Sequence, residues 1–511
     1  MNVLQCWRAA RPQTSSGRYR KAAFAGLATA AIVCGPVAGQ PNIDGEWNDP
    51  HNTGTLWGAN YRAFAMHAVH LPTGSILIWQ YPADDSFLWD PVADTLTEIE
   101  TPANFPIDCS GHAGLPDGTI LVAGRTEKTK VFSLGPVPGG PWQTVEDMTY
   151  FRFYPTCTTL PDGRVLASSG LEEFGQVVLT PEIFDPGNDP LQGTWEVLGI
   201  SMNGIGKLYP HMFVVPDDDP NVQKVFFSSS WVALDLDDDE ITYMLDIGAL
   251  TWTAVGGLPP FTGRFGSAVM YEPGVVLKCG GQDQVGGLGF LDRTATIDLT
   301  DATPVWILED SMEFARQMHN LVLLPDGKIL AVGGSKSGDP VKDAEWFDPN
   351  EPLPIWRKLA AMELGRADHS TAVLLADGRV LSAGSDGGTA EIFSPPYLFW
   401  GDPPKIGFAP TGVSYGTNFS VMLSSGSPVP VEEIDKVSFL RLGSTTHSID
   451  MDQRYVRLEF QVDTLQPNAL IVEPPANASY APPGYYMLFL ISDDGVPSIA
   501  KYVRLTAPIT P

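Results

Sequence analysis

One pattern of apolar and polar positions recurs along most of the chain. Two apolar residues lead into a polar turn, usually Asp-Gly, and a β-rich run then ends on small residues. Such runs on both sides of a short glycine turn predict a β-hairpin. The clear copies are HLPTGSILIW (70–79), GLPDGTILVAG (114–124), TLPDGRVLASSG (159–170), LLPDGKILAVGG (323–334) and LLADGRVLSAG (374–384), and two degenerate copies are FVVPDDDPNVQKVFFSSS (213–230) and VMYEPGVVLKCGG (269–281).

The spacing of these copies predicts the architecture. Neighbouring turn glycines lie 44, 45, 53 and 51 residues apart, and the longer gap from Gly163 to Gly274 holds one more copy. A period near 50 residues is typical of a kelch-like β-propeller whose blades are four-stranded antiparallel sheets. Seven copies therefore predict seven blades. Further blade strands, each with an aromatic residue that would pack between blades, are PEIFDP (181–186), AEWFDP (344–349) and AEIFSP (390–395).

The rhythm stops after Pro395 and Pro396, and short strands follow at the spacing of a β-sandwich. These strands are FSVMLSSG (419–426), KVSFLRLG (436–443), VRLEFQV (456–462), YYMLFLISD (485–493) and AKYVRLT (500–506). We therefore expect an all-β protein: a propeller over residues 40–396 and an Ig-like sandwich over 397–511. Residues 40–60 are expected to include a strand that closes the ring.

The N-terminus predicts a signal peptide over residues 1–39. A basic segment precedes an apolar run at 22–33, and Val37, Ala38 and Gly39 give small residues for cleavage. An uncleaved membrane anchor is the alternative, although the run is short for a span. We expect an exported, monomeric protein with no membrane span after the leader.

Charge and cysteine content narrow the expected partners. Without the leader, 26 Lys and Arg face 60 Asp and Glu, a net charge of −34. Such a surface repels nucleic acid and anionic membranes, although solubility alone also accounts for it. The same segment keeps Cys109, Cys157 and Cys279, an odd number that leaves at least one thiol outside any intrachain disulfide.

Several segments resemble the galactose oxidase and glyoxal oxidase family of copper-radical oxidases, in the same order and over nearly the whole exported chain. They are DCSGHAGLPDG (108–118), RFYPTCTTLPDGRVL (152–166), ADHSTAVLLADGRVL (367–381), SPPYLF (394–399), TTHSIDMDQR (445–454) and PPGYYMLFLISDDGVPSIAKYVRL (482–505).

This resemblance implies a copper site on the propeller axis. The motifs carry the family's equatorial tyrosine over to Tyr154, its thioether-linked cysteine to Cys109, and its histidine ligands to His369 and His447. Imidazole nitrogen suits Cu(II). The Cys-Tyr pair and copper would together remove two electrons from a small aldehyde, alcohol or carbohydrate, and O2 would be reduced to H2O2. Copper and the crosslinked tyrosine are the only cofactors that this reading requires.

Each of these residues also has a structural reading. Cys109 could be a plain buried cysteine or a disulfide partner of Cys157, and the tyrosine and histidines could be core residues. Cys157 is expected to face away from copper because it lies three positions after Tyr154 on a strand. The aromatic ring that the family stacks on its Cys-Tyr pair is assigned to Phe174.

One position departs from the family. The tyrosine that precedes the first histidine ligand, and takes the substrate's proton, is replaced by Asp368. A carboxylate can bind copper and accept a proton, but it is intrinsically a weaker base than a phenolate. We therefore assign Asp368 as base and ligand, and note Tyr209 as a tyrosine that could compensate.

Two functions remain open at this point. The first is an exported copper-dependent oxidase of the glyoxal oxidase type, acting on aldehydes or primary alcohols. The second is a catalytically impaired or non-enzymatic kelch-propeller protein with a binding or wall-associated role, which Asp368 favours.

Overall fold

The structure is a computed structural model. It describes residues 40–48, 64–80, 85–102, 106–135, 140–173, 175–202, 208–232, 241–257, 259–261, 263–283, 289–385 and 388–506. The predicted leader and Phe174 lie outside these residues. Almost all regular structure in the described part is β-strand, which confirms the all-β class. The helices there are α1 (Pro41–Asp44) and the short 3₁₀ turns Pro190–Gln192, Pro396–Phe399 and Val431–Glu433.

Each of the seven predicted hairpins forms the first two strands of an antiparallel sheet. The first two sheets are β2 (His67–His70), β3 (Ile76–Trp79), β4 (Ser86–Asp90) and β5 (Thr95–Ile99), then β6 (Ser110–Gly114), β7 (Ile120–Gly124), β8 (Thr129–Phe132) and β9 (Trp142–Thr144). The next two are β10 (Thr156–Thr159), β11 (Val165–Ser168), β12 (Glu182–Asp185) and β13 (Thr194–Val197), then β14 (Leu208–Val215), β15 (Lys224–Val232), β16 (Tyr243–Asp246) and β17 (Thr251–Ala254).

Three further sheets complete the repeat region. They are β18 (Ser267–Glu272), β19 (Val275–Cys279), β22 (Thr294–Asp298) and β23 (Ile307–Leu308); β24 (Gln317–Leu323), β25 (Ile329–Lys336), β27 (Asp343–Phe347) and β28 (Trp356–Ala361), with β26 (Asp339–Pro340) on β25; and β29 (Ser370–Leu374), β30 (Val380–Gly384), β31 (Ala390–Ser394) and β1 (Glu46–Trp47). A separate pair is β20 (Gln282–Asp283) with β21 (Gly289–Phe290).

The turn glycines used to find the repeat share one backbone conformation. Gly74, Gly118, Gly163, Gly274, Gly327 and Gly378 have φ between 83° and 96°. Only glycine adopts this region without steric cost, so the residue type at the turn sets the register of each hairpin.

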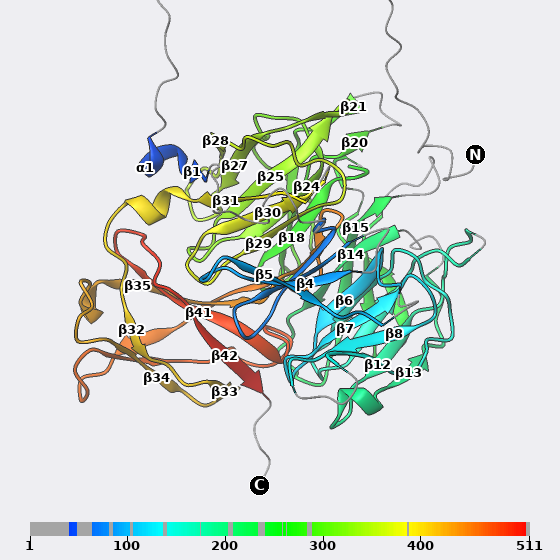
Figure 1. Ribbon diagram of the computed structural model, residues 1–511, viewed down its shortest axis with the longest axis horizontal. Coiled ribbons are helices and arrows are strands. Elements are labelled where there is room, and N and C mark those ends of the chain that lie inside the picture. The colour runs from blue at the N-terminus through cyan, green and yellow to red at the C-terminus, as the bar shows by residue number, and fades with distance from the viewer. Residues whose placement is uncertain are drawn as a thin grey trace, which may run out of the picture. The chain divides into compact units, whose positions relative to one another are not determined.

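The first strands of successive sheets lie side by side. β6 lies beside β10, β10 beside β14, β14 beside β18, β18 beside β24, β24 beside β29, and β29 beside β2 (Figure 1). The expected closing strand is β1, in which Glu46 and Trp47 pair with Ser394 and Phe393 of β31. Consequently, the sheet that ends the repeat region also contains its first strand.

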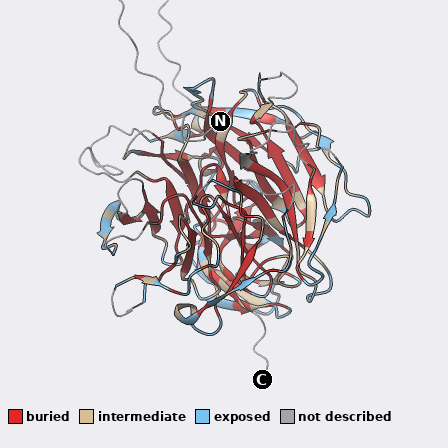
Figure 2. Ribbon diagram, turned by 90° about the vertical axis from the view of Figure 1, so that its right-hand side faces the viewer, coloured by how far each residue is buried: buried red, intermediate tan, exposed pale blue. Residues whose placement is uncertain are grey.

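The C-terminal strands form two sheets around a common apolar core. One sheet has the order β32 (Ile406–Phe408), β34 (Phe419–Leu423), β40 (Ala469–Val472) and β39 (Phe460–Val462). The other has the order β33 (Gly412–Ser414), β42 (Lys501–Thr506), β41 (Gly484–Ser492), β35 (Ile434–Arg441) and β38 (Tyr455–Leu458). Buried residues fill the sheets, whereas exposed residues gather on the connecting loops (Figure 2).

The hairpin β36 (Ser444–Thr446) and β37 (Ile449–Asp450) follows β35 and leaves these two sheets. β36 pairs with β2, with Thr446 opposite His67, and it also lies beside β6. The C-terminal segment thus contributes strands to the first sheet of the repeat region.

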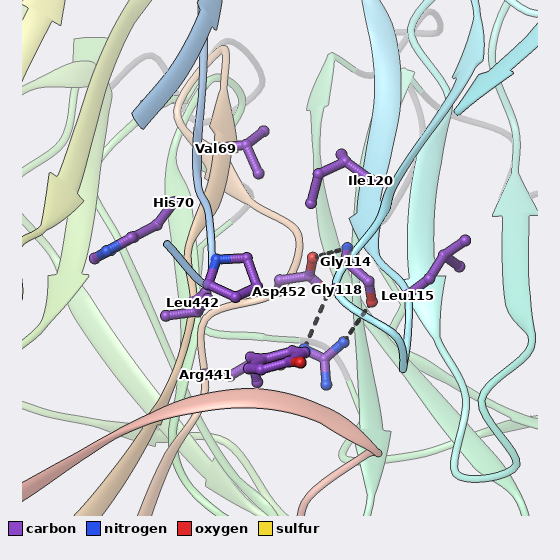
Figure 3. Close-up of a pocket in the computed structure, with 11 residues that line it drawn as sticks. Val69, His70, Gly114, Leu115, Gly118, Ile120, Arg441, Leu442 and Asp452 are labelled. Carbon is purple, nitrogen blue, oxygen red and sulfur yellow. Dashed lines mark hydrogen bonds and ion pairs between the residues drawn. The ribbon is translucent and has the colours of Figure 1, made fainter. Parts of the chain in front are cut away.

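Arg441 of β35 secures this connection. Its guanidinium donates to the carbonyl of Gly114 at 2.8 Å and to the carboxylate of Asp452 at 3.2 Å, and Asp452 accepts from the backbone N–H of Gly114 (Figure 3). The small pocket drawn there is lined by none of the candidate site residues.

A buried Arg–Glu lock recurs in three sheets. The arginine lies before the first strand and donates to the carbonyl at the end of the second strand, and the glutamate lies on the third strand. The pairs are Arg152 with Glu182, Arg316 with Glu345, and Arg366 with Glu391. Each glutamate also accepts a backbone N–H from the loop before its arginine. The lock therefore fixes the segment that leads into the first strand.

Candidate active site

The candidate residues lie where the first strands begin. Six of these strands carry a non-glycine residue of positive φ at or just before their start: Cys109 (53°), Tyr154 (65°), Tyr209 (45°), Phe265 (60°), Met318 (55°) and His369 (58°). This conformation is uncommon for non-glycine residues, so its recurrence marks one equivalent position in each sheet. Cys109, Tyr154 and His369 were predicted as site residues. The sequence analysis did not predict that the same positive-φ position recurs at the start of six first strands.

Backbone hydrogen bonds join several of these positions directly. The N–H of Tyr154 donates to the carbonyl of Cys109 at 2.9 Å, and the N–H of Tyr209 donates to that of Tyr154 at 2.9 Å. The N–H of Met318 donates to the carbonyl of Phe265 at 2.7 Å. Neighbouring sheets are thus linked through the residues whose side chains form the candidate site.

Arg–Glu locks precede two of the site residues. Arg152, which pairs with Glu182 at 2.8 Å, is two residues before Tyr154, and Arg366 is three residues before His369. Both arginines are buried. Arg152 donates to Ser169, Thr180 and Glu182, whereas Arg366 donates through Nη1 to Gly384 and Thr389 and lies 3.7 Å from Glu391. These buried contacts help to hold the segment that leads to each positive-φ residue.

Cys109 and Tyr154 are in direct side-chain contact. Their backbones are hydrogen-bonded, and the thiol and the phenol lie near enough to shift each other's pKa. Burial raises the pKa of both groups, and so does their mutual proximity for Tyr154, so both are neutral at physiological pH. Cys109, Cys157 and Cys279 are all buried free thiols, which rules out the Cys109–Cys157 disulfide in this structure. Cys157 packs against Gly111 within the core.

His447 lies in the turn between β36 and β37 and reaches the same place. Its ring centroid is 4.6 Å from that of His369 and 5.4 Å from that of Tyr154. Its Nδ1 is 2.6 Å from the Thr446 hydroxyl, which itself lies 3.0 Å from the Met66 carbonyl. With that hydroxyl donating to the carbonyl, His447 donates from Nδ1 and keeps the lone pair on Nε2. Burial lowers the pKa of His447 well below its usual value, so the ring is neutral.

Asp368 contacts His369 through both carboxylate oxygens. Oδ1 accepts the backbone N–H of His369 at 2.9 Å, and Oδ2 lies 3.5 Å from Nδ1 of the same imidazole. A carboxylate on Nδ1 orients an imidazole and leaves Nε2 available to a ligand. The Asp368 side chain is 33% exposed and the His369 side chain 13%, so the carboxylate is the more accessible of the two.

Tyr209 is buried beside the site, but its hydroxyl is engaged elsewhere. The hydroxyl donates its proton to the Ser110 carbonyl at 3.0 Å, and the ring packs against the imidazole of His447 at a centroid distance of 5.0 Å. This arrangement does not support Tyr209 as a replacement for the tyrosine missing at position 368.

Among the ring contacts of the described residues, the nearest to Tyr154 is Phe153, which sequence reasoning did not single out. Its centroid is 4.3 Å from that of Tyr154, in an edge-on arrangement, and the guanidinium of Arg125 lies over the Phe153 ring at 5.0 Å. Arg125 also donates to Asp108 at 2.9 Å. Phe174, the ring assigned from sequence, lies outside the described residues, so that assignment stays a prediction.

Within the described ranges, no three His, Cys, Asp or Glu side chains form a metal site by themselves. Tyrosine is not among these four residue types, although its phenol oxygen can also bind a metal ion. The donors that do gather here are two imidazoles and a phenol, a nitrogen and oxygen set that suits Cu(II). The residues present therefore fit a copper ion, provided that a phenol completes the set.

Comparisons with known proteins agree with this arrangement. Residues 267–396 match the model "Glyoxal oxidase N-terminus", and residues 403–505 match "Galactose oxidase-like, Early set domain". An aldehyde oxidase (GLOX) of Vitis pseudoreticulata is 29% identical over 78% of this chain and 81% of its own length. A galactose oxidase of Gibberella zeae is 26% identical over 86% of this chain and 69% of its own length.

Among solved structures, a fungal alcohol oxidase of the AA5 family, in complex with copper, has a similar fold. The TM-score is 0.76 at 22% identity, over 90% of this chain and 99% of the other. By both of its matched segments, the chain is a relative of the galactose oxidase and glyoxal oxidase family.

Proposed function

We propose that this protein is an exported copper-radical oxidase of the glyoxal oxidase type, which oxidises small aldehydes or primary alcohols with O2 and releases H2O2. The observation that carries the proposal is the proximity of the Cys109 thiol to the Tyr154 phenol, beside the imidazoles of His369 and His447. A thiol held against a phenol is the precursor that a Cys-Tyr thioether requires.

In this proposal Tyr154, His369 and His447 hold the copper ion, the histidines through Nε2. When bound, copper would supply one oxidising equivalent and the thioether-linked tyrosine a second, so that a substrate can lose two electrons. The Thr446 hydroxyl orients His447, and the Asp368 carboxylate orients His369.

Asp368 is also proposed to accept the proton of the substrate's hydroxyl group. Its carboxylate is the more exposed partner of the Asp368–His369 pair, and a substrate entering from solvent would meet it first. The overall reaction balances as RCH2OH + O2 giving RCHO + H2O2. Direct ligation of copper by Asp368, the role assigned from sequence, is a further possibility that the same carboxylate allows.

The fold is part of the proposal. We interpret the seven sheets of the repeat region as the blades of a kelch-type propeller over residues 40–396, and residues 397–511 as an Ig-like domain. Their cyclic neighbour relations and the closing strand β1 support this reading. The leader at 1–39 would direct export of a monomer. No helix of the described part could span a membrane.

A second candidate function is a copper-binding or copper-free propeller without turnover, in a binding or wall-associated role. The observation that favours it is Asp368 at the position of the family's tyrosine, together with a Tyr209 hydroxyl that donates to the Ser110 carbonyl. In that case the fold and the hydrogen bond between Cys109 and Tyr154 would persist, and no peroxide would form.

The test is mass analysis of the protein after copper loading in air. The wild type is expected to lose the mass of two hydrogen atoms, in a peptide pair that joins Cys109 to Tyr154. Cys109→Ser should abolish the crosslink, whereas Cys157→Ser, which alters another buried free thiol, should retain it. Peroxide release with glyoxal-type aldehydes and primary alcohols then measures turnover.

The outcomes separate the candidates. A crosslink together with peroxide supports the oxidase, and a crosslink without peroxide supports the second function. A wild-type protein that binds copper in air and remains uncrosslinked would contradict radical chemistry altogether.

A further inference from the structure

Two buried histidines that the proposed reaction does not use lie behind Cys109. His67 of β2 and His112 of β6 are fully buried. The backbone N–H of Cys109 lies 3.0 Å from Nε2 of His67, and Nδ1 of His67 lies 3.0 Å from Nε2 of His112. Nδ1 of His112 contacts the hydroxyl of Ser444 on β36.

The position of every proton in this series follows from its first member. A backbone N–H can only donate, so Nε2 of His67 must accept and its proton must lie on Nδ1. That proton is donated to Nε2 of His112, whose own proton therefore lies on Nδ1 and is donated to Ser444. Ser444 can in turn donate to the His112 carbonyl, at 3.4 Å. We refer to His67, His112 and Ser444 as the histidine relay.

The surrounding packing keeps the relay in place. The indole of Trp79 stacks on His67, with centroids 4.7 Å apart and planes 7° apart, and its Nε1–H donates to the Ile107 carbonyl at 2.8 Å. The loop that ends in Cys109 is therefore held by Trp79 at Ile107 and by His67 at Cys109 itself.

The relay also joins the two halves of the site. Ser444 belongs to the hairpin that carries His447, and His67 is paired across strands with Thr446, the residue that orients His447. The same three side chains thus connect the backbone of Cys109 to the hairpin from the C-terminal segment.

We propose that His67 is a positioning residue, which acts through the histidine relay to fix the positive-φ backbone of Cys109 and thereby hold the thiol against the Tyr154 phenol. The positive φ of Cys109, 53°, is a strained conformation for a residue with a side chain, and it needs such an external support. That His67 supports the backbone of Cys109 does not depend on enzymatic activity. That this support promotes the Cys109–Tyr154 thioether rests on the proposed function.

Two variants test the two ring nitrogens of His67 separately: Nε2, which accepts from Cys109, and Nδ1, which donates to His112. In His67→Gln the amide oxygen reaches the position of Nε2 and can still accept from Cys109. In His67→Asn the shorter amide reaches only the position of Nδ1, so the bond to Cys109 is lost while the one to His112 can remain. Because Asn also leaves a larger cavity than Gln, His67→Leu completes the series: it fills the volume of the imidazole without an acceptor. A purely space-filling role predicts that exchange at Cys109 in His67→Leu matches the Gln variant, whereas the positioning role predicts that it matches the Asn variant.

The first readout is hydrogen–deuterium exchange of the Cys109 amide in the copper-free protein, resolved to single residues. We expect about tenfold faster exchange in His67→Asn and near wild-type exchange in His67→Gln, since a buried hydrogen bond is worth roughly that factor. His70→Gln is the control: His70 lies on the same strand and is equally buried, but it contacts Leu374 and Tyr502 instead. It should leave the Cys109 amide unchanged.

The second readout is the rate of Cys109–Tyr154 crosslinking after copper addition, expected to fall about tenfold in His67→Asn and to recover in His67→Gln. Amides of β41 report whether each variant is folded. If His67→Asn is not, Ser444→Ala carries the test, because it breaks the relay at its far end and should also speed exchange at Cys109.

Equal exchange at Cys109 in the Asn and Gln variants, or no change in Ser444→Ala, would overturn the positioning role. If the wild type never crosslinks, the proposed function fails, but the exchange experiment still decides whether His67 supports Cys109.

Discussion

The phenol ring of Tyr209 packs against the imidazole of His447, with centroids 5.0 Å apart and planes inclined by 38°, while the Tyr209 hydroxyl donates to the Ser110 carbonyl. The hydrogen bond to Ser110 thus fixes the ring that packs against His447. Tyr209→Phe is therefore expected to lower the free energy of unfolding by about 1 kcal/mol, through the loss of a buried hydrogen bond, and to retain the Cys109–Tyr154 crosslink. Denaturant unfolding and mass analysis measure the two effects.

The control for that variant is Tyr154→Phe, which also removes one buried hydroxyl. It should lose the crosslink entirely, because the phenol activates the ring toward the thiol. Loss of the crosslink in Tyr209→Phe as well would show that Tyr209 takes part in the chemistry, as the sequence hypothesis of compensation suggested.

Asp368 is expected to act on copper through His369. Removal of a carboxylate that orients a metal-binding imidazole typically lowers affinity by about 10- to 100-fold, so Asp368→Ala should weaken copper binding by that factor. Asp368→Asn should have a smaller effect, since its one side-chain oxygen can still accept either the backbone N–H or the Nδ1 proton of His369, which the two carboxylate oxygens contact separately. Copper titration measures both, and unchanged affinity in Asp368→Ala would remove this role.

Asp450 gives the fold a pH dependence with a definite sign. Burial raises its pKa from 3.8 to about 6, against the opposing effect of three backbone N–H donors. Above pH 6 the carboxylate is ionised in both the folded and unfolded states, and the folded state bears the cost of a buried charge. Below the unfolded pKa both states are protonated and that cost disappears. The contribution of Asp450 to stability is thus lost as the pH rises from about 4 to 6.

Asp450→Asn keeps the oxygen that accepts the three N–H groups but removes the charge. Its gain in free energy of unfolding over the wild type should be greatest above pH 6, at about 3 kcal/mol, and smallest near pH 4. Urea unfolding of both proteins across this range measures the difference. A constant difference from pH 4 to pH 7.5 would contradict the assignment.

The Arg–Glu lock should be a large stabilising element only while both partners are present. Glu182→Ala leaves Arg152 as a buried, uncompensated charge and should lower the free energy of unfolding by about 3–5 kcal/mol. Glu351→Ala removes the partner of Arg357 in an ion pair that is half exposed, and should cost less than about 1 kcal/mol. Similar losses in the two variants would mean that the lock has no special role.

The repeat region was predictable because its signals are local. The Asp-Gly turns and their alternating strands set each hairpin with residues adjacent in sequence, and all six turn glycines have the φ that this requires. The strands of the C-terminal segment were predictable for the same reason.

The Arg–Glu locks show where local signals end. The prediction read PEIFDP, AEWFDP and AEIFSP as strands with a packing aromatic, and overlooked the glutamate in each. The partner arginines lie about 25–30 residues earlier, in other parts of the repeat, so no hydrophobic period connects them. The sequence did contain one indication of the locks: a glutamate recurs at the same position of these three motifs, with an apolar residue on each side.

For the site, motif resemblance supplied Cys109, Tyr154, Asp368, His369 and His447, and the structure brings their side chains into one region. The residues that support them were not predictable, because their contacts cross from one sheet to another. Nothing in the sequence connects His67 and His112 with the backbone of Cys109, and only the three-dimensional arrangement shows that His67 accepts its N–H.

The pairing of β1 with β31 has a consequence for the whole repeat region. Because β1 comes from the start of the described chain and β31 from the end of the repeat region, the last sheet is complete only when these two distant segments come together. Cys109, Tyr154 and His369 each precede the first strand of a different sheet, so the distances between their side chains depend on how those sheets pack against one another. A site built in this way keeps its dimensions when individual residues around it change, which leaves the connecting loops free to diverge.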